Sequence, residues 1–103
     1  MGKNKDIEIA SNILAQAIIH KIVPDYTNKP ESIEHMKKEQ IEYKTQSFKT
    51  LAERNWNEDG KKKIRENVIE KVQNILRLKY PDIIIDKEEL LERINIELTE
   101  YLL

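Results

Sequence analysis

The chain contains no cysteine, and it has only two glycines and three prolines in 103 residues. Without cysteine there can be no disulfide framework, no thiolate nucleophile and no cysteine-ligated zinc, and a reducing, cytoplasmic location is the simplest expectation. Glycine and proline are too few for the many tight turns of a β-sandwich, and aromatic residues, which favour strands, make up only 6% of the chain. The composition therefore predicts an all-α protein.

What the chain does have is charge of both signs. Charged residues make up 36% and apolar residues 39%, yet the net charge is −1. Such balanced charge is typical of solvated, amphipathic helices and provides no overall basic excess for nucleic-acid binding. The length is that of one domain with one modest core.

The spacing of apolar residues predicts a small bundle of about four helices, near residues 6–23, 31–56, 61–79 and 87–102. The first has a broad apolar stripe, is expected to be the central core helix, and should end at Pro24. Asn28 and Asp86 stand where they would cap the second and fourth helices. The second helix is long and polar, and its sparse apolar stripe consists of Ile33, Ile41, Phe48, Leu51 and Ala52.

The last two predicted helices are electrostatic complements. Residues 61–82 carry seven basic and three acidic side chains, whereas residues 83–103 carry two basic and six acidic ones. We therefore predict an antiparallel C-terminal helical hairpin around a shared apolar seam, with Lys62 and Glu66 as an exposed i,i+4 pair. Ile83, Ile84 and Ile85 should form an extended link that places isoleucines against the core.

A basic group opens the third predicted helix and is a candidate anion-binding site. Its members are Lys61, Lys62, Lys63 and Arg65. Nucleic-acid binding through these residues is one alternative function. Against it, no Gly-rich phosphate loop precedes them, and lysines at a helix start oppose the helix dipole.

Sequence motifs for catalysis and metal binding are missing. Neither His20 nor His35 has a serine or carboxylate at a spacing that suggests a catalytic triad. No EF-hand loop or H-E-x-x-H motif is present. We expect His20 to be a hydrogen-bonded core residue, and we expect no catalytic, cofactor or metal site.

Membrane action is a second alternative. The most apolar stretch, Ile9 to Val23, is too short and too polar to span a bilayer. No small-residue cleavage site follows Lys3 and Lys5, as a signal peptide would require. Residues 7–23 could instead lie in a membrane interface as an amphipathic helix, although basic residues are scarce there.

A family resemblance is carried by residues 58–103, "EDGKKKIRENVIEKVQNILRLKYPDIIIDKEELLERINIELTEYLL". A Lys-rich helix opens at Gly60 to Lys63, a hydrophobic link follows at Ile83 to Ile85, and an acidic-capped amphipathic helix covers Asp86 to Leu102. This pattern resembles the C-terminal region of the LLH family of bacteriophage holins. The resemblance implies phage origin, a helical hairpin and a holin-like lysis accessory role. The family's membrane-spanning first helix has no counterpart in this sequence.

Taken together, these features favour a non-enzymatic small helical protein that acts by protein–protein binding. A phage or mobile-element accessory or inhibitor protein would fit this description. The long second helix is expected to overhang a domain of this size and to expose Met36 and Tyr43. Met36, Tyr43 and Phe48 are therefore the candidate partner-binding residues. The simplest partner is a second copy of the chain in a two-fold homodimer.

Overall fold

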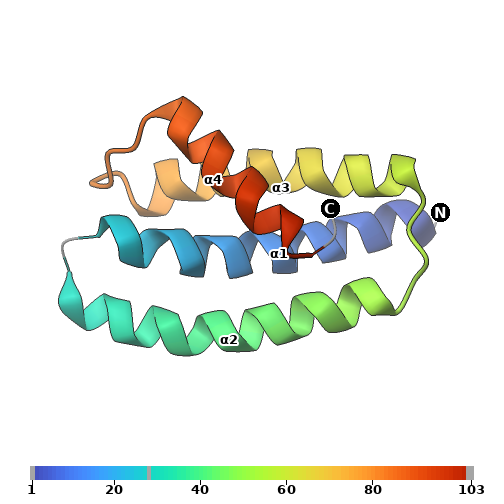
Figure 1. Cartoon of the computed structure of the whole chain (residues 1–103), viewed down its shortest axis with the longest axis horizontal. Coiled ribbons are helices and arrows are strands. Elements are labelled where there is room, and N and C mark those ends of the chain that lie inside the picture. Colours follow the sequence, from blue (N-terminus) through green and yellow to red (C-terminus); the bar gives the residue numbers. More distant parts are fainter. Residues whose placement is uncertain (1, 28, 102–103) are drawn as a thin grey trace.

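The computed structural model describes residues 2–27 and 29–101, and this part of the chain is helical without β-strands. Its four helices are α1 (Gly2–Tyr26), α2 (Pro30–Ala52), α3 (Glu58–Lys79) and α4 (Lys87–Thr99). Helix α1 lies between α2 and α3, and the shorter α4 crosses the bundle at an angle (Figure 1). The predicted all-α bundle is confirmed.

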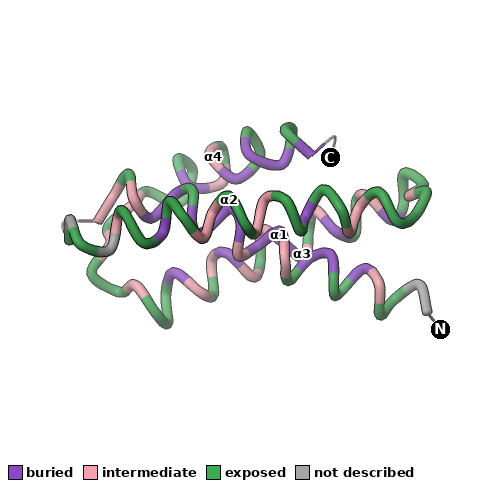
Figure 2. Tube along the Cα trace, turned by 90° about the horizontal axis from the view of Figure 1, so that it is seen from below, coloured by how far each residue is buried: buried purple, intermediate pink, exposed green. Residues whose placement is uncertain are grey.

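Helix α1 forms the centre of the core, as its broad apolar stripe predicts. It packs along both α2 and α3, which do not contact each other directly along their backbones. Buried positions therefore occur around much of its circumference (Figure 2). Small side chains allow neighbouring helices to approach closely, and the buried Ser11 hydroxyl is satisfied by donating to the Ile7 carbonyl at 2.6 Å. The apolar core residues of α1 are Ile7, Ala10, Leu14, Ala15, Ala17, Ile18, Ile19, Ile22 and Val23.

Helix α1 continues past Pro24 to Tyr26, so the predicted end at Pro24 is wrong. A proline in a helix removes one N–H donor and crowds the carbonyl four residues earlier. In the final turn this disruption is local, and the Thr27 N–H still donates to the Val23 carbonyl at 2.9 Å. The Tyr26 hydroxyl also donates to Glu89 of α4 at 3.1 Å, which helps to hold the last turn in place.

The buried face of α2 differs from the predicted apolar stripe. Met36 is 5% exposed and belongs to the core, whereas Ile41 is 67% exposed. The expectation that Met36 lies at the surface is therefore wrong. The face toward α1 also includes Ser47, whose hydroxyl donates to the Tyr43 carbonyl at 2.8 Å. A hydroxyl satisfied within its own helix can be buried, so a purely apolar pattern missed this face.

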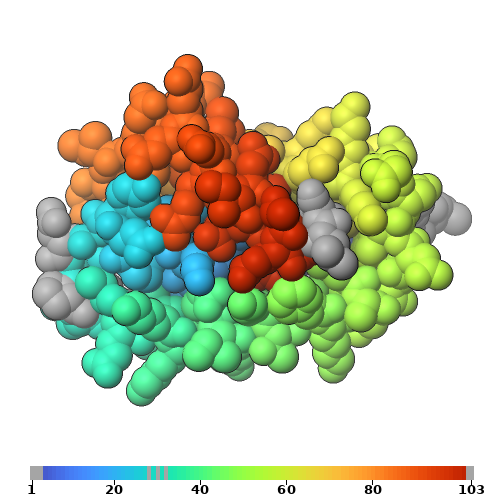
Figure 3. Space-filling model, viewed as in Figure 1, coloured from blue at the N-terminus to red at the C-terminus, as the bar shows by residue number. Residues whose placement is uncertain are grey.

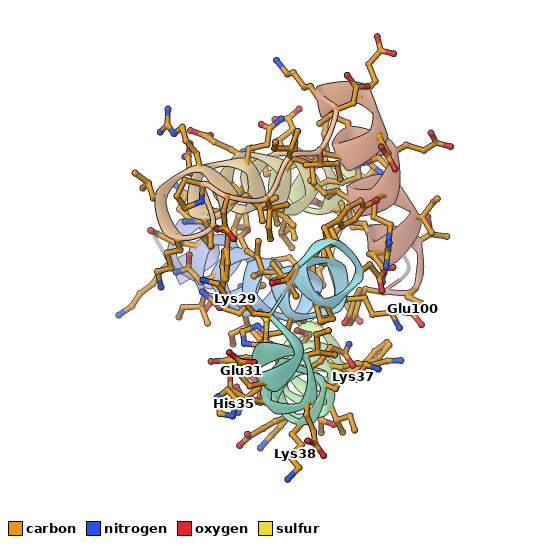
Figure 4. The ribbon with its side chains drawn as sticks, turned by 90° about the vertical axis from the view of Figure 1, so that its left-hand side faces the viewer. Lys29, Glu31, His35, Lys37, Lys38 and Glu100 are labelled. Carbon is orange, nitrogen blue, oxygen red and sulfur yellow. The ribbon has the colours of Figure 1, made fainter. Side chains whose placement is uncertain are left out.

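Helix α2 does not overhang the bundle, because the 25-residue α1 runs beside its 23 residues. It also ends at Ala52 rather than at Trp56, which belongs to the connection to α3. The exposed positions of α2 carry charges of both signs, including Glu34, Lys38 and Glu42, and Lys38 points away from the bundle (Figure 4).

Helix α3 begins at Glu58, three residues before the predicted start at Lys61. The Asn57 side chain caps it by accepting a hydrogen bond from the Gly60 N–H at 2.7 Å. Glu58 and Asp59 occupy the first turn, where carboxylates are favoured by the helix dipole. The conflict expected between the lysines and the dipole is therefore absent.

The two predicted caps of α2 and α4 fare differently. Asn28 lies outside the described residues, and Lys29 occupies the N-cap position of α2 without a side-chain hydrogen bond. Asp86 is at the N-cap position of α4, but its side chain makes no capping hydrogen bond. Helix α4 is thus positioned mainly by its packing and its ion pairs.

The C-terminal helices contact each other, but α4 crosses α3 instead of lying along its whole length (Figure 1). Within the described part of the chain, the predicted Lys62–Glu66 pair is not formed. Lys63 instead pairs with Asp59 of its own helix at 3.3 Å. In the link before α4, Ile83 and Ile85 pack against the core as expected, while Ile84 is 93% exposed.

Arg93 ties α4 to the end of α1. Its Nη2 lies 2.6 Å from Asp25, and its Nε lies 3.2 Å from the buried Glu97. Burial lowers the pKa of Arg93, but the hydrogen bonds to these two carboxylates outweigh burial and leave the pKa raised. The guanidinium therefore remains a permanent cation between two acids.

We expect Arg93→Met to lower the free energy of unfolding by about 1–3 kcal/mol, because Glu97 would lose its charged partner while remaining buried. Lys63→Met, which removes an exposed pair, should cost less than about 0.5 kcal/mol. Urea denaturation followed by circular dichroism measures both. Equal effects of the two substitutions would show that Arg93 does not anchor α4.

Candidate binding groove

An apolar groove lies where three parts of the fold meet. These parts are the C-terminal end of α2, the connection to α3, and Tyr101, which follows α4. In Figure 3 the C-terminal part of the chain, in red, lies directly against the green surface of α2. The groove has a volume of about 370 Å³ and is lined by Phe48, Leu51, Ala52, Arg54, Asn55, Trp56, Lys61 and Tyr101.

Aromatic rings supply much of the groove surface and hold one another in place. The ring centroids of Phe48 and Tyr101 are 4.7 Å apart with a tilt of 36°. The Trp56 indole N–H donates to the Leu51 carbonyl at 3.1 Å, which fixes the ring against the end of α2. Phe48 is 44% exposed, whereas Tyr101 is 6% exposed. The groove thus combines a fixed base with an accessible aromatic edge.

Charges of both signs surround this groove, and its charged lining residues are cations. Burial, followed by the nearby carboxylates of Glu100 and Glu97, raises the pKa of Tyr101 to about 12, so its phenol is neutral at physiological pH. Among the described lining residues, the charged ones are Arg54 and Lys61. The groove is therefore apolar inside, and its two charged lining residues are cations that pair within the chain, Arg54 with Asp6 and Lys61 with Glu58.

The three predicted partner-binding residues do not form one exposed surface. Phe48 lines the groove, as described above. Met36 is buried in the core, and Tyr43 is half-buried with its ring 4.9 Å from that of His20. Phe48 is the one of the three whose side chain is exposed. Homodimerisation stays a prediction, but its interface cannot be built on Met36.

The predicted anion-binding residues are likewise separated. Lys61 lines the apolar groove, whereas Lys63 lines a different, polar groove of about 500 Å³ between α1 and α3. Glu66 and Glu70 share that polar groove with Lys63, and Lys62 is exposed. Arg65 is half-buried. The structure does not gather these cations into one site, and nucleic-acid binding stays a prediction.

His20 and Glu39 form a polar contact between α1 and α2. The His20 Nε2 lies 2.8 Å from Glu39, and its Nδ1 lies 2.7 Å from the Gln16 carbonyl. His35 approaches the other oxygen of Glu39 at 2.8 Å. Within the residues that the structure describes, no cluster of three or more His, Cys, Asp or Glu is arranged to hold a metal. His20 is a hydrogen-bonded core histidine, as its sequence environment predicts.

Sequence reasoning missed Trp56 and Tyr101 as groove residues. Both types are enriched at protein interfaces, and this chain has one tryptophan, so composition alone could have drawn attention to Trp56. Trp56 follows the end of α2, whereas the contact of Tyr101 with Phe48 depends on how α4 crosses the bundle. No local pattern encodes that crossing.

Comparisons with protein-family models, curated proteins and solved structures found no match to this chain. In the described part of the chain, none of the helices combines the length and the apolar character needed to cross a membrane. The candidate function therefore depends on the groove itself.

Proposed function

We propose that this chain is a non-enzymatic helical protein that binds another protein through its aromatic groove. The observation that carries the proposal is the accessible apolar surface around Phe48 and Trp56. Buried aromatic anchors contribute a large share of the binding energy at protein interfaces. A partner side chain that entered the groove would cover this surface and remove it from water.

The nature of the groove favours a protein segment over a small metabolite. Its described lining offers two charged groups and several aromatic or aliphatic surfaces, without a metal-binding cluster. Such a site matches the anchoring of a bulky side chain from a partner, which needs contact area more than many convergent polar groups.

The proposal includes a cytoplasmic location, which the absence of cysteine supports. A phage or mobile-element inhibitor role remains a prediction from size and charge, and a holin-like accessory role remains a prediction from the resemblance of residues 58–103. In both roles the protein would act through a partner. The groove is a surface at which a host or phage protein could be held.

Photo-crosslinking in the native host tests this proposal. A photoreactive residue at Asn55, which lines the groove, should trap one defined partner protein on irradiation. The matched control carries the same residue at Asn95, an exposed position of α4 that is not among the groove residues. Adducts of the same pattern from both positions, or none from Asn55, would contradict binding at the groove.

A further inference from the structure

We propose that the occupant of the groove is an acidic segment of a partner protein with a bulky apolar side chain as its anchor. This inference rests on the proposed function and adds the chemistry of the partner. It is carried by the placement of Arg54 and Lys61 beside the exposed aromatic surface of the groove.

Phe48, Trp56 and Tyr101 form the apolar surface of the groove. Phe48 is 44% exposed although its ring already contacts Tyr101, so part of an aromatic face remains in water. A leucine or phenylalanine from a partner would cover this face and extend the aromatic cluster. The anchor side chain therefore supplies affinity through burial.

Arg54 can donate hydrogen bonds to a partner carboxylate without losing its own ion pair. It pairs with Asp6 of α1 through Nη2, and its side chain remains 47% exposed. A guanidinium has five N–H donors in a planar fork, so one carboxylate leaves donors for another. A carboxylate beside the anchor side chain would find these donors at the groove edge.

Lys61 is held only weakly within the chain. Its Nζ lies 4.0 Å from Glu58, whose side chain is 96% exposed. Exposed pairs of this kind contribute little to stability, so exchanging Glu58 for a partner carboxylate carries a small cost. The two cations thus favour acidic partners and disfavour basic ones, a preference that should weaken as salt is added.

Trp56 provides a direct readout, because it is the single tryptophan of the chain and it lines the groove. The probes are two terminally blocked helical peptides, both with leucines on one face. One carries glutamates on the other face, and its counterpart carries lysines there. Each is titrated into the full chain while Trp56 emission is recorded at low and at physiological salt.

We expect the glutamate peptide to shift Trp56 emission saturably and to bind roughly tenfold or more tightly than the lysine peptide at low salt. Arg54→Glu combined with Lys61→Glu should reverse this preference. Lys61→Glu alone should reduce it while keeping the Arg54 ion pair. Lys62→Glu, at an exposed position outside the groove, is the matched control and should leave the preference unchanged.

Equal affinity for the two peptides, or no emission change with either, would overturn the acidic-partner inference. A Trp56 shift that depends on protein concentration without peptide would assign the groove to a second copy of the chain and would overturn it as well. A partner trapped at Asn55 combined with equal peptide affinities would retain the proposed function and reject only the partner's chemistry.

Discussion

Val72→Asp and Leu98→Asp should each unfold the protein at room temperature. Both side chains are 0% exposed, one on α3 and the other on α4. An aspartate at either position would bury a carboxylate without a partner, at a cost of several kcal/mol. A domain of this size has a stability near the low end of roughly 5–15 kcal/mol, so this loss is as large as the whole free energy of unfolding.

Ile84→Asp is the matched control, because Ile84 is 93% exposed in the link before α4. It introduces the same charge and should leave the thermal transition within a few degrees of the wild type. Circular dichroism melts of the three variants provide the comparison. A cooperative transition retained by both core variants would show that these positions are not in the core.

Residues 57–103 on their own should be largely unfolded, although they contain both α3 and α4. The buried side chains of α3, including Ile64 and Val68, belong to the same core cluster as those of α1. Contacts between α3 and α4 are few compared with those between α1 and α3. Without α1, the apolar face of α3 would lie in water, and isolated helices of this length are marginally stable.

Far-UV circular dichroism of this fragment beside the full chain measures the effect. The fragment should show a small fraction of the helix signal and no cooperative melt. A stable fragment with a cooperative melt would support the self-contained C-terminal hairpin that the sequence predicts. It would contradict the claim that α3 and α4 need α1 in order to fold.

The sequence predicts the helices better than their surfaces. The start of α4 and the end of α3 agree with prediction, because Pro81 and the apolar spacing mark them locally. The start of α3 differs from the predicted Lys61, because the cluster from Asn55 to Gly60 is rich in turn-forming residues and favours a loop when read locally. The structure uses Asn57 as the cap and includes Glu58 to Gly60 in the helix.

Tertiary packing explains the remaining errors. On α2, Met36 enters the core while the more hydrophobic Ile41 stays 67% exposed, because the neighbours of α2 select one face. The complementary charges of α3 and α4 predict a hairpin of these two helices, yet Arg93 of α4 pairs with Asp25 of α1. Charge patterns show which side chains need partners but do not identify them.

The candidate site was only partly predictable for the same reason. Phe48 was singled out from the sparse apolar stripe of α2, and it does line the groove. The contact of Tyr101 with Phe48 joins residues 53 positions apart, and local spacing does not predict it. Only the folded arrangement brings the aromatic residues together.

The affinity of a Phe48→Glu variant for the partner trapped at Asn55 tests the central claim most directly. Ile41→Glu is its matched control, since both residues are exposed on α2 but Ile41 lies outside the groove. If the groove is the binding site, Phe48→Glu should bind the partner at least roughly tenfold more weakly while its thermal transition stays unchanged. Ile41→Glu should bind the partner with the affinity of the wild type. Full affinity of a folded Phe48→Glu variant would contradict the claim that this groove is the binding site.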